Sequence, residues 1–219
     1  GPQSGVVGWL NRKVFEETGD EAKAQGWSAL ILDTNGNGQR DEYVEPNQPV
    51  DPKKDKRIAA ALYGVGVNPQ DGSVWGSVIG FPGSVVRVAP GANPPATTLA
   101  EVYEVPAPGF GPRGMDIDRA GIVWIPLSSG HMASFDRRKC KGPLNGPTAT
   151  GKHCAEGWNL IPFPGPQLQG VTDAGSAEAS RSCAVVLTRE RRYVHSSAKP
   201  WSNIWSLSSK TRYATSPST

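Results

Sequence analysis

Short apolar strands and glycine-containing turns alternate along most of this 219-residue chain. Residues 64–75, GVGVNPQDGSVW, are the clearest case, with apolar residues on both sides of an Asp-Gly pair. Such a pair between apolar segments is a strong β-hairpin signal, because the turn needs residues that tolerate a positive φ. This segment therefore predicts two strands joined by a tight turn at Asp71 and Gly72.

A second copy of this hairpin follows further along the chain. Residues 114–124, GMDIDRAGIVW, have the same order of strand, turn and Trp, and residues 83–88 and 130–135 match one another as the next strand. Weaker copies of the pattern cover residues 27–44 and 158–171. The chain therefore carries an internal repeat of roughly 40–50 residues, each unit being a small antiparallel sheet.

A repeat of this length is typical of β-propeller blades, in which sheets stacked around an axis cover each other's faces. The predicted fold is all-β, a partial β-propeller of about four blades over residues 1–180. A β-sandwich is the alternative. Because most propellers need more blades to close, the chain, which starts without Met, is expected to be a fragment that further blades of the same protein complete. Four recurring tryptophans are expected to pack between sheets: Trp27, Trp75, Trp124 and Trp158.

Composition changes sharply near residue 180. All 26 glycines precede this point, and residues 181–219 contain a single acidic residue, Glu190. This segment holds seven Lys and Arg residues, whereas acidic residues outnumber basic ones in residues 1–180, so the net charge of +3 comes from the basic segment. We expect a basic, Ser- and Arg-rich tail that is out of frame or disordered, with a natural basic tail as the alternative. Its cations attract nucleic acid only without sequence preference, so no specific nucleic-acid partner is predicted.

The repeated motif resembles that of a known family. Residues 112–124, PRGMDIDRAGIVW, and their copy at residues 63–75 resemble the blade motif of virginiamycin B lyase-like, or streptogramin lyase-like, β-propellers. Residues 32–38 and 134–140 resemble a bacterial branch of that family. The resemblance covers residues 5–180 and is more specific for the architecture than for a reaction.

This resemblance implies two functional alternatives. The family's lyase opens a cyclic depsipeptide by elimination, using a histidine base and a divalent metal. No histidine of this chain stands in a matching pattern, so the resemblance provides no catalytic residue. We therefore expect a binding or scaffold propeller of an exported bacterial protein, with a small-molecule or peptide ligand. The alternative is a C–O lyase whose active-site blades, with their Mg²⁺, are missing from this chain.

Residues 33–41, DTNGNGQRD, are similar to a calcium-binding loop. Oxygen-bearing side chains occur at positions 1, 3, 5 and 9, glycine is at position 6, and position 7 offers its backbone carbonyl. The sequence departs from the pattern at position 12, where Val44 replaces the usual Glu. A structural Ca²⁺ is predicted, and an Asn-Gly turn between two strands is the alternative. The predicted ligands are Asp33, Asn35, Asn37, Gln39 and Asp41.

Two cysteines enclose a loop rich in Gly, Pro and Thr. Cys140 and Cys154 are predicted to form a disulfide, which implies an oxidising, extracytoplasmic location in the periplasm or outside the cell. A zinc site is the weaker alternative, because no second Cys or His pair has ligand spacing, and a reduced pair is another. No apolar segment reaches ~18 residues, so no membrane span is predicted.

Arg113 and His131 are the candidate pocket residues. Arg113 opens the second clear repeat, and His131 follows a glycine at the start of a predicted inner strand. Strand entrances of a propeller line its channel or rim, where ligands bind. The alternative is a surface arginine and a solvated histidine.

Overall fold

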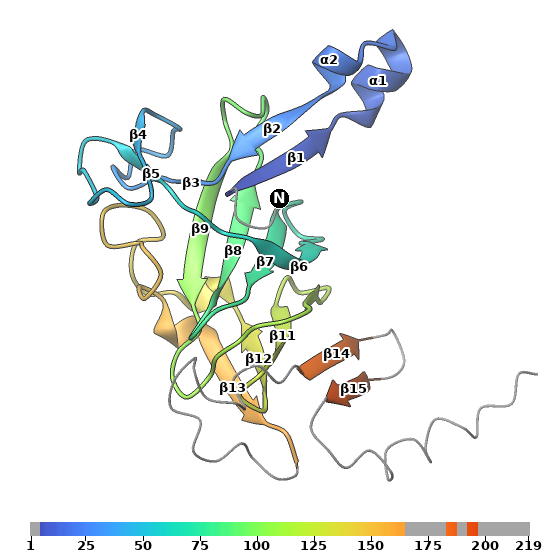
Figure 1. The fold of residues 1–219 in the computed structure, drawn as a ribbon, viewed down its shortest axis with the longest axis vertical. Helices are drawn as coiled ribbons and strands as arrows, with labels where there is room; N and C mark the ends of the chain where they lie inside the picture. The colour runs from blue at the N-terminus through green and yellow to red at the C-terminus, as the bar shows by residue number, and fades with distance from the viewer. Residues whose placement is uncertain (1–4, 165–182, 188–191, 197–219) are drawn as a thin grey trace, which may run out of the picture.

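The computed structural model describes residues 5–164 and two short strands at 183–187 and 192–196. Over these residues the fold is all-β, with several antiparallel sheets and no closed barrel, as Figure 1 shows. No helix in the described parts of the chain is long and apolar enough to cross a membrane. The predicted all-β class is therefore confirmed.

The first clear repeat forms four antiparallel strands in sequence order. The Asp-Gly turn lies where the sequence predicts it, and Gly72 has the positive φ of 70° that the turn requires. Each strand is hydrogen-bonded to the next, so the unit is a meander. Its strands are β6 (Leu62–Val67), β7 (Val74–Val78), β8 (Ser84–Ala89) and β9 (Leu99–Glu104).

Three short strands extend this meander past β9 into a seven-stranded sheet. β3 runs parallel to β9, β5 runs antiparallel to β3, and β4 lies at the far edge beside β5. These strands are β3 (Ile31–Leu32), β4 (Tyr43–Val44) and β5 (Asp55–Arg57).

The second clear repeat forms a separate four-stranded antiparallel meander. Gly121, with φ of 80°, occupies its first turn, as Gly72 does in the other copy. A short 3-10 helix follows the third strand, and another precedes the fourth: η1 (Arg137–Lys139) and η2 (Ala155–Gly157). The strands are β10 (Asp116–Ile117), β11 (Val123–Leu127), β12 (His131–Phe135) and β13 (Trp158–Pro162).

A two-stranded ribbon with two short helices precedes these sheets. Asn11 caps the first helix by accepting a hydrogen bond from the Val14 amide, and Gly19, with φ of 65°, ends it. The elements are β1 (Val6–Leu10), α1 (Arg12–Thr18), α2 (Glu21–Ala24) and β2 (Gln25–Ala29). Further along, β14 (Cys183–Leu187) and β15 (Arg192–Ser196) form another antiparallel pair.

The main apolar core contains side chains from both meanders. Trp75 and Tyr103 of the first lie against Phe135 of the second, with ring centroids 5.9 and 4.5 Å from it. Burial of such large aromatic rings is the main favourable contribution to packing here. The buried members are Trp75, Val85, Tyr103, Val105, Val123, Ile125, Leu127, Ala133, Phe135 and Cys154.

Equivalent parts of the two meanders also lie in contact. A Cβ atom added at Gly64 of β6 would lie 2.9 Å from the Cα atom of Gly114, its counterpart in the second repeat. Between the two turns, the Gln70 side chain donates a hydrogen bond to the Arg119 carbonyl, 2.6 Å away. The two copies therefore pack side by side in the same orientation.

Three expectations from the repeat pattern need correction. Residues 41–44 were expected to return beside residues 27–33, but β4 pairs with β5 and not with β3. Residues 158–163 were expected to begin another unit, but β13 pairs with β12 and completes the second meander. Trp27 was expected to pack between sheets, but it is 67% exposed. The pairing of β4 and of β13 and the exposure of Trp27 all depend on distant residues that a local pattern does not specify.

Candidate functional site

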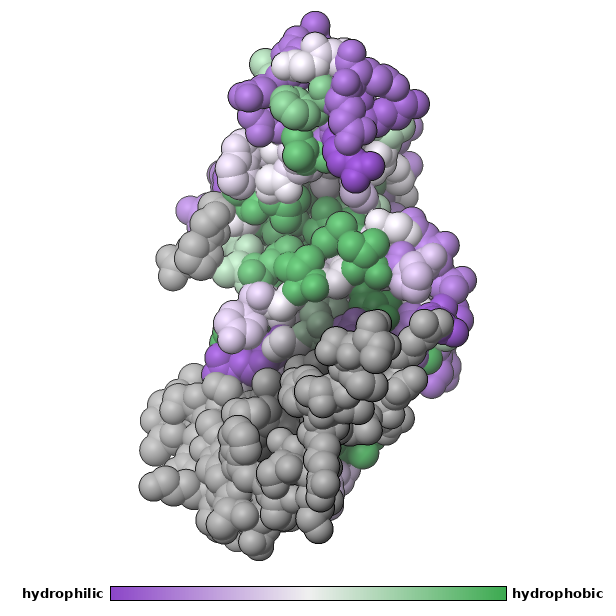
Figure 2. Space-filling view, turned by 90° about the vertical axis from the view of Figure 1, so that its right-hand side faces the viewer, coloured by the Kyte–Doolittle hydropathy of each residue, from purple (hydrophilic) through white to green (hydrophobic). Residues whose placement is uncertain are grey.

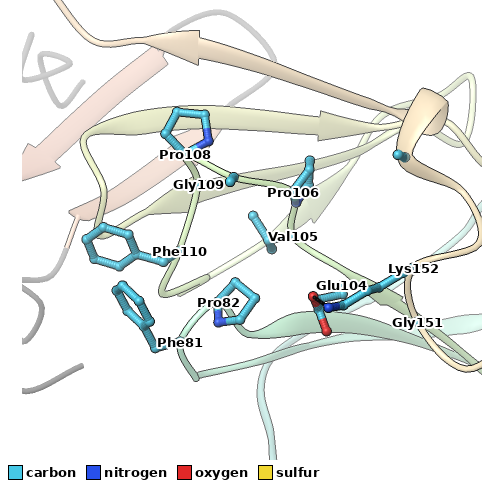
Figure 3. Close-up of a pocket in the computed structure, with 12 residues that line it drawn as sticks. Phe81, Pro82, Glu104, Val105, Pro106, Pro108, Gly109, Phe110, Gly151 and Lys152 are labelled. Atoms are coloured by element: carbon cyan, nitrogen blue, oxygen red, sulfur yellow. Dashed lines mark ion pairs between the residues drawn. The ribbon is translucent and has the colours of Figure 1, made fainter. Parts of the chain in front are cut away.

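An apolar cleft of about 580 Å³ lies between the segment before β8 and the loop after β9, as Figure 3 shows. Phe81 and Phe110 form one end, with ring centroids 4.7 Å apart. Lys152 and Glu104 form the other, with Nζ 3.5 Å from the carboxylate oxygen. Apolar walls with a few polar groups are typical of small-ligand pockets. The walls between these ends include Pro82, Val105, Pro106 and Pro108.

Two glycines with positive φ hold the cleft segments together. Gly83, with φ of 85°, accepts a hydrogen bond from the Val105 amide (3.0 Å), and its missing Cβ would lie 2.5 Å from the Pro112 side chain. Gly111, with φ of 66°, donates to the Pro82 carbonyl (2.9 Å). Only glycine adopts this backbone without strain, so these positions determine the cleft's shape.

A cluster of charged side chains lies between the meanders and is centred on the buried Glu101. Its Oε1 accepts hydrogen bonds from the Nη atoms of Arg87 and Arg137, at 2.9 and 2.7 Å. Its Oε2 accepts from Arg137 Nε and the Tyr103 hydroxyl, both at 2.6 Å. Both oxygens are fully engaged, so this Glu101 network ties the sheets together and offers no free carboxylate for catalysis.

Electrostatic effects in the Glu101 network follow from burial and pairing. Burial and the Glu101 carboxylate raise the pKa of the Tyr103 hydroxyl far above its usual value. Arg87 also pairs with Asp71 at 2.8 Å. Burial alone would raise the pKa of Asp71, but hydrogen bonds from Ser73 and the pairing with Arg87 lower it to about 2. At neutral pH Tyr103 therefore stays protonated and Asp71 stays ionised.

The predicted disulfide between Cys140 and Cys154 is present, with their Cα atoms 5.0 Å apart. It closes the loop that contributes Lys152 to the cleft, and Cys154 is buried in the main core. The His153 ring lies against Tyr103 with ring centroids 5.1 Å apart and planes tilted by 36°, and burial lowers the pKa of His153. The zinc alternative for this cysteine pair is wrong, because both sulfur atoms are in the disulfide.

The two predicted pocket residues lie at one turn but do not line the cleft. Arg113 Nε donates to the Ser128 hydroxyl (3.3 Å), and His131 Nδ1 lies 3.1 Å from the Ser129 hydroxyl. Ser129 in turn accepts a hydrogen bond from the amide of Phe110, a cleft residue. The turn between β11 and β12 therefore links both residues to the cleft indirectly.

The apolar cleft walls carry no sequence motif, so sequence reasoning missed them.

The structure also gathers most of the predicted metal ligands. Asp33 accepts hydrogen bonds from the Gly36 and Gly38 amides, at 2.7 and 2.8 Å. The side-chain amides of Asn35 and Asn37 both donate to Asp41 Oδ2, at 2.8 and 2.6 Å. Gln39 takes part through its backbone and not its side chain, because its backbone amide donates a hydrogen bond to the Asn37 side chain. The loop also joins two strands, β3 and β4, which do not pair with each other, so an Asn-Gly turn between two strands remains the alternative.

A carboxylate from outside the loop, Asp55, lies beside it and was not predicted. Burial raises its pKa, the backbone amide of Asp41 lowers it, and the carboxylates of Asp33 and Asp41 raise it further. Across the described residues, no three His, Cys, Asp or Glu side chains converge closely enough to form a metal site by themselves. A cation here would therefore also need amide and backbone oxygens.

The apolar cleft is the candidate binding site because of its shape and the side chains that line it. The cleft offers apolar walls, and the Glu104–Lys152 pair is its charged feature among the described residues. The Glu101 network and the disulfide hold its surroundings in place. A comparison of the chain with protein-family models, curated proteins and solved structures finds no match in any of the three.

Proposed function

We propose that this chain is a binding or scaffold β-propeller domain of an exported bacterial protein, and that the apolar cleft receives its small-molecule or peptide ligand. The observation that carries the proposal is the contact between equivalent parts of two repeated meanders, with Gly64 against Gly114. Consecutive propeller blades pack in this way, face to face and in the same orientation.

An exposed apolar strand supports the propeller arrangement. Tyr63, Val65 and Val67 of β6 are 62%, 57% and 61% exposed, although strands of this composition are normally covered. Figure 2 shows hydrophobic residues gathered across the middle of the side on which β6 lies in Figure 1. In a complete ring of about four or more blades, such an inner strand would face the channel and the further blades.

The chemistry of the cleft favours binding over catalysis. Its walls are apolar, and its Glu104 and Lys152 neutralise each other at 3.5 Å. An apolar group against Phe81 and Phe110 would gain burial and ring contacts. The disulfide supports export, because disulfides persist outside the reducing cytoplasm. The resemblance to streptogramin lyases supports the same architecture without supplying a catalytic residue.

Binding can be tested with anilinonaphthalene sulfonate, a dye that fluoresces in apolar pockets. We expect saturable fluorescence that Phe81→Ala weakens roughly 2- to 10-fold, because an aromatic contact is lost. Phe15→Ala is the matched control, since Phe15 on α1 is 41% exposed and Phe81 is 40% exposed. Equal effects of the two substitutions would show that the cleft is not the binding site.

The lyase alternative makes a different prediction. Elimination opens the ring of a cyclic depsipeptide without changing its mass, so chromatography must be used to follow it. Incubation of the chain with such a depsipeptide and Mg²⁺ should leave the ring closed if the chain is a binding domain. Turnover by the purified chain would replace the binding proposal with the lyase.

A further inference from the structure

Asp55 is an unusual buried carboxylate. It is 0% exposed at the start of β5, and its Oδ1 has no hydrogen-bond partner among the described residues. Its Oδ2 accepts a hydrogen bond from the backbone amide of Asp41, 2.8 Å away. The Thr34 amide donates to the Leu32 carbonyl at 2.9 Å and also lies near enough to the Asp55 carboxylate to lower its pKa. Burying a charged oxygen without a partner is costly, and a bound cation would offset that cost.

Strand pairing directs Asp55 towards the 33–41 loop. β5 runs beside β4 with Asp55 opposite Tyr43, and the Asp55 amide donates to the Glu42 carbonyl at 2.9 Å. At the other end of the loop, the Thr34 hydroxyl donates to the Lys54 carbonyl at 2.8 Å. Both ends of the loop are therefore attached to the backbone at Lys54 and Asp55.

The other acidic residues near position 12 of the loop are already paired. Glu42 forms an ion pair with Lys54 at 3.0 Å, and Glu45 forms one with Arg57 at 3.1 Å. Neither Glu42 nor Glu45 therefore supplies the carboxylate that the calcium-loop pattern requires at position 12, where Val44 stands. Asp55 reaches the loop from a neighbouring strand, with an oxygen that has no other partner.

We propose that the 33–41 loop and Asp55 together form a Ca²⁺ site, in which Asp55 supplies the carboxylate that position 12 lacks. The proposal is independent of what the apolar cleft binds. The site would tie the loop to β5 at the edge of the seven-stranded sheet. The donor set is Asp33, Asn35, Asn37, the Gln39 carbonyl, Asp41 and Asp55.

The donor chemistry fits calcium. All the donors are oxygens, and Ca²⁺ takes six to eight of them in flexible geometry, whereas Mg²⁺ requires a tight octahedron. The side-chain oxygens of Asn35 and Asn37 each accept one backbone N–H and keep a second lone pair. Arg40, the cation within the loop, donates to the Thr98 carbonyl at 3.3 Å. Three carboxylates thus remain for a divalent cation to neutralise.

Calorimetric titration of the whole EDTA-treated chain with CaCl₂ tests the proposal. We expect about one Ca²⁺ per chain, with much weaker binding of Mg²⁺. At a hundredfold excess over Kd, the thermal unfolding midpoint should rise by about 5–10 °C relative to EGTA. A folded chain that binds no Ca²⁺ would overturn the proposal.

Asp55→Asn distinguishes a ligand from a merely structural residue. It should weaken Ca²⁺ binding at least about tenfold, because Ca²⁺ affinity depends on the number of charged ligands. In EGTA the variant should be at least as stable as the parent, because it removes an uncompensated charge. Unchanged affinity would contradict a ligand role, and so would a loss of stability that is the same with and without Ca²⁺.

Two further variants complete the test. Asp41→Asn changes an exposed residue of the donor set, so it should fold and also weaken Ca²⁺ binding. Asp51→Asn is the matched control, because its carboxylate accepts a hydrogen bond from Lys53 and is not in the proposed set. Equal effects of Asp51→Asn and Asp55→Asn would reveal nonspecific charge attraction and overturn the site.

Discussion

The contact between the two repeated meanders makes a sharp prediction about a pair of equivalent glycines. In Gly64→Ala, the new Cβ would lie 2.9 Å from both Gly114 Cα and the Met115 amide nitrogen, and 3.1 Å from the Arg113 carbonyl oxygen. These are backbone atoms, so no side-chain rotation can relieve the overlap. Overpacking of this kind costs about 1–3 kcal/mol of unfolding free energy.

The same glycine-to-alanine substitution at the equivalent position, Gly114, should be harmless. A Cβ atom added at Gly114 meets no atom within 4 Å, and its φ is not positive. Gly114→Ala should therefore leave stability unchanged or raise it by up to about 1 kcal/mol, because alanine restricts the unfolded chain.

Thermal and urea unfolding, followed by Trp fluorescence, would measure both variants. For a domain of this size, Gly64→Ala should lower the midpoint by about 2–12 °C. Gly114→Ala should not lower it. If the two substitutions destabilise equally, or if Gly64→Ala has no effect, the meanders do not pack as described.

Three other predictions concern stability. Replacing Cys140 and Cys154 by Ala should lower the unfolding free energy by about 3 kcal/mol, as urea unfolding would show, because the bond closes a loop with a sequence separation of 14. Glu101→Gln should cost about 3 kcal/mol in the same assay, because it removes the charge partner of Arg137 and leaves Arg87 with Asp71 alone. By contrast, Glu16→Gln removes an exposed pair and should cost under about 0.5 kcal/mol. Since the folded-state pKa of Asp71 is lowered to about 2, its stabilising effect is present above pH ~4 and is lost as pH falls towards 2. Asp71→Asn should therefore flatten the fall of the urea midpoint over this pH range, and an unchanged slope would contradict the assignment.

Some features of this protein could be predicted from the sequence because their signals are local. The turns at Gly72 and Gly121 need positive φ, and the apolar residues on either side of each turn form the two strands of a hairpin. The disulfide was predictable because the two cysteines bracket a short turn-rich loop, which brings them together readily. The oxygen-rich spacing of residues 33–41 likewise indicates the loop that the structure contains.

Other features depend on which strands meet, and strand pairing depends on packing over long sequence distances. β13 completes the second meander, although its sequence alone resembles the start of a new repeat. The helix at Arg12–Thr18, which carries no buried side chain, gave no apolar periodicity to detect.

The sequence by itself determined the all-β class, the repeated hairpins, the disulfide and the composition of the candidate calcium loop. Only the tertiary structure brought Asp55 to that loop, assembled the Glu101 network from separate strands and formed the apolar cleft. The physical reason is the distance along the sequence between the interacting residues. Turns and Asx contacts depend on neighbouring residues, whereas burial and charge pairing depend on groups that the folded chain brings together from far apart.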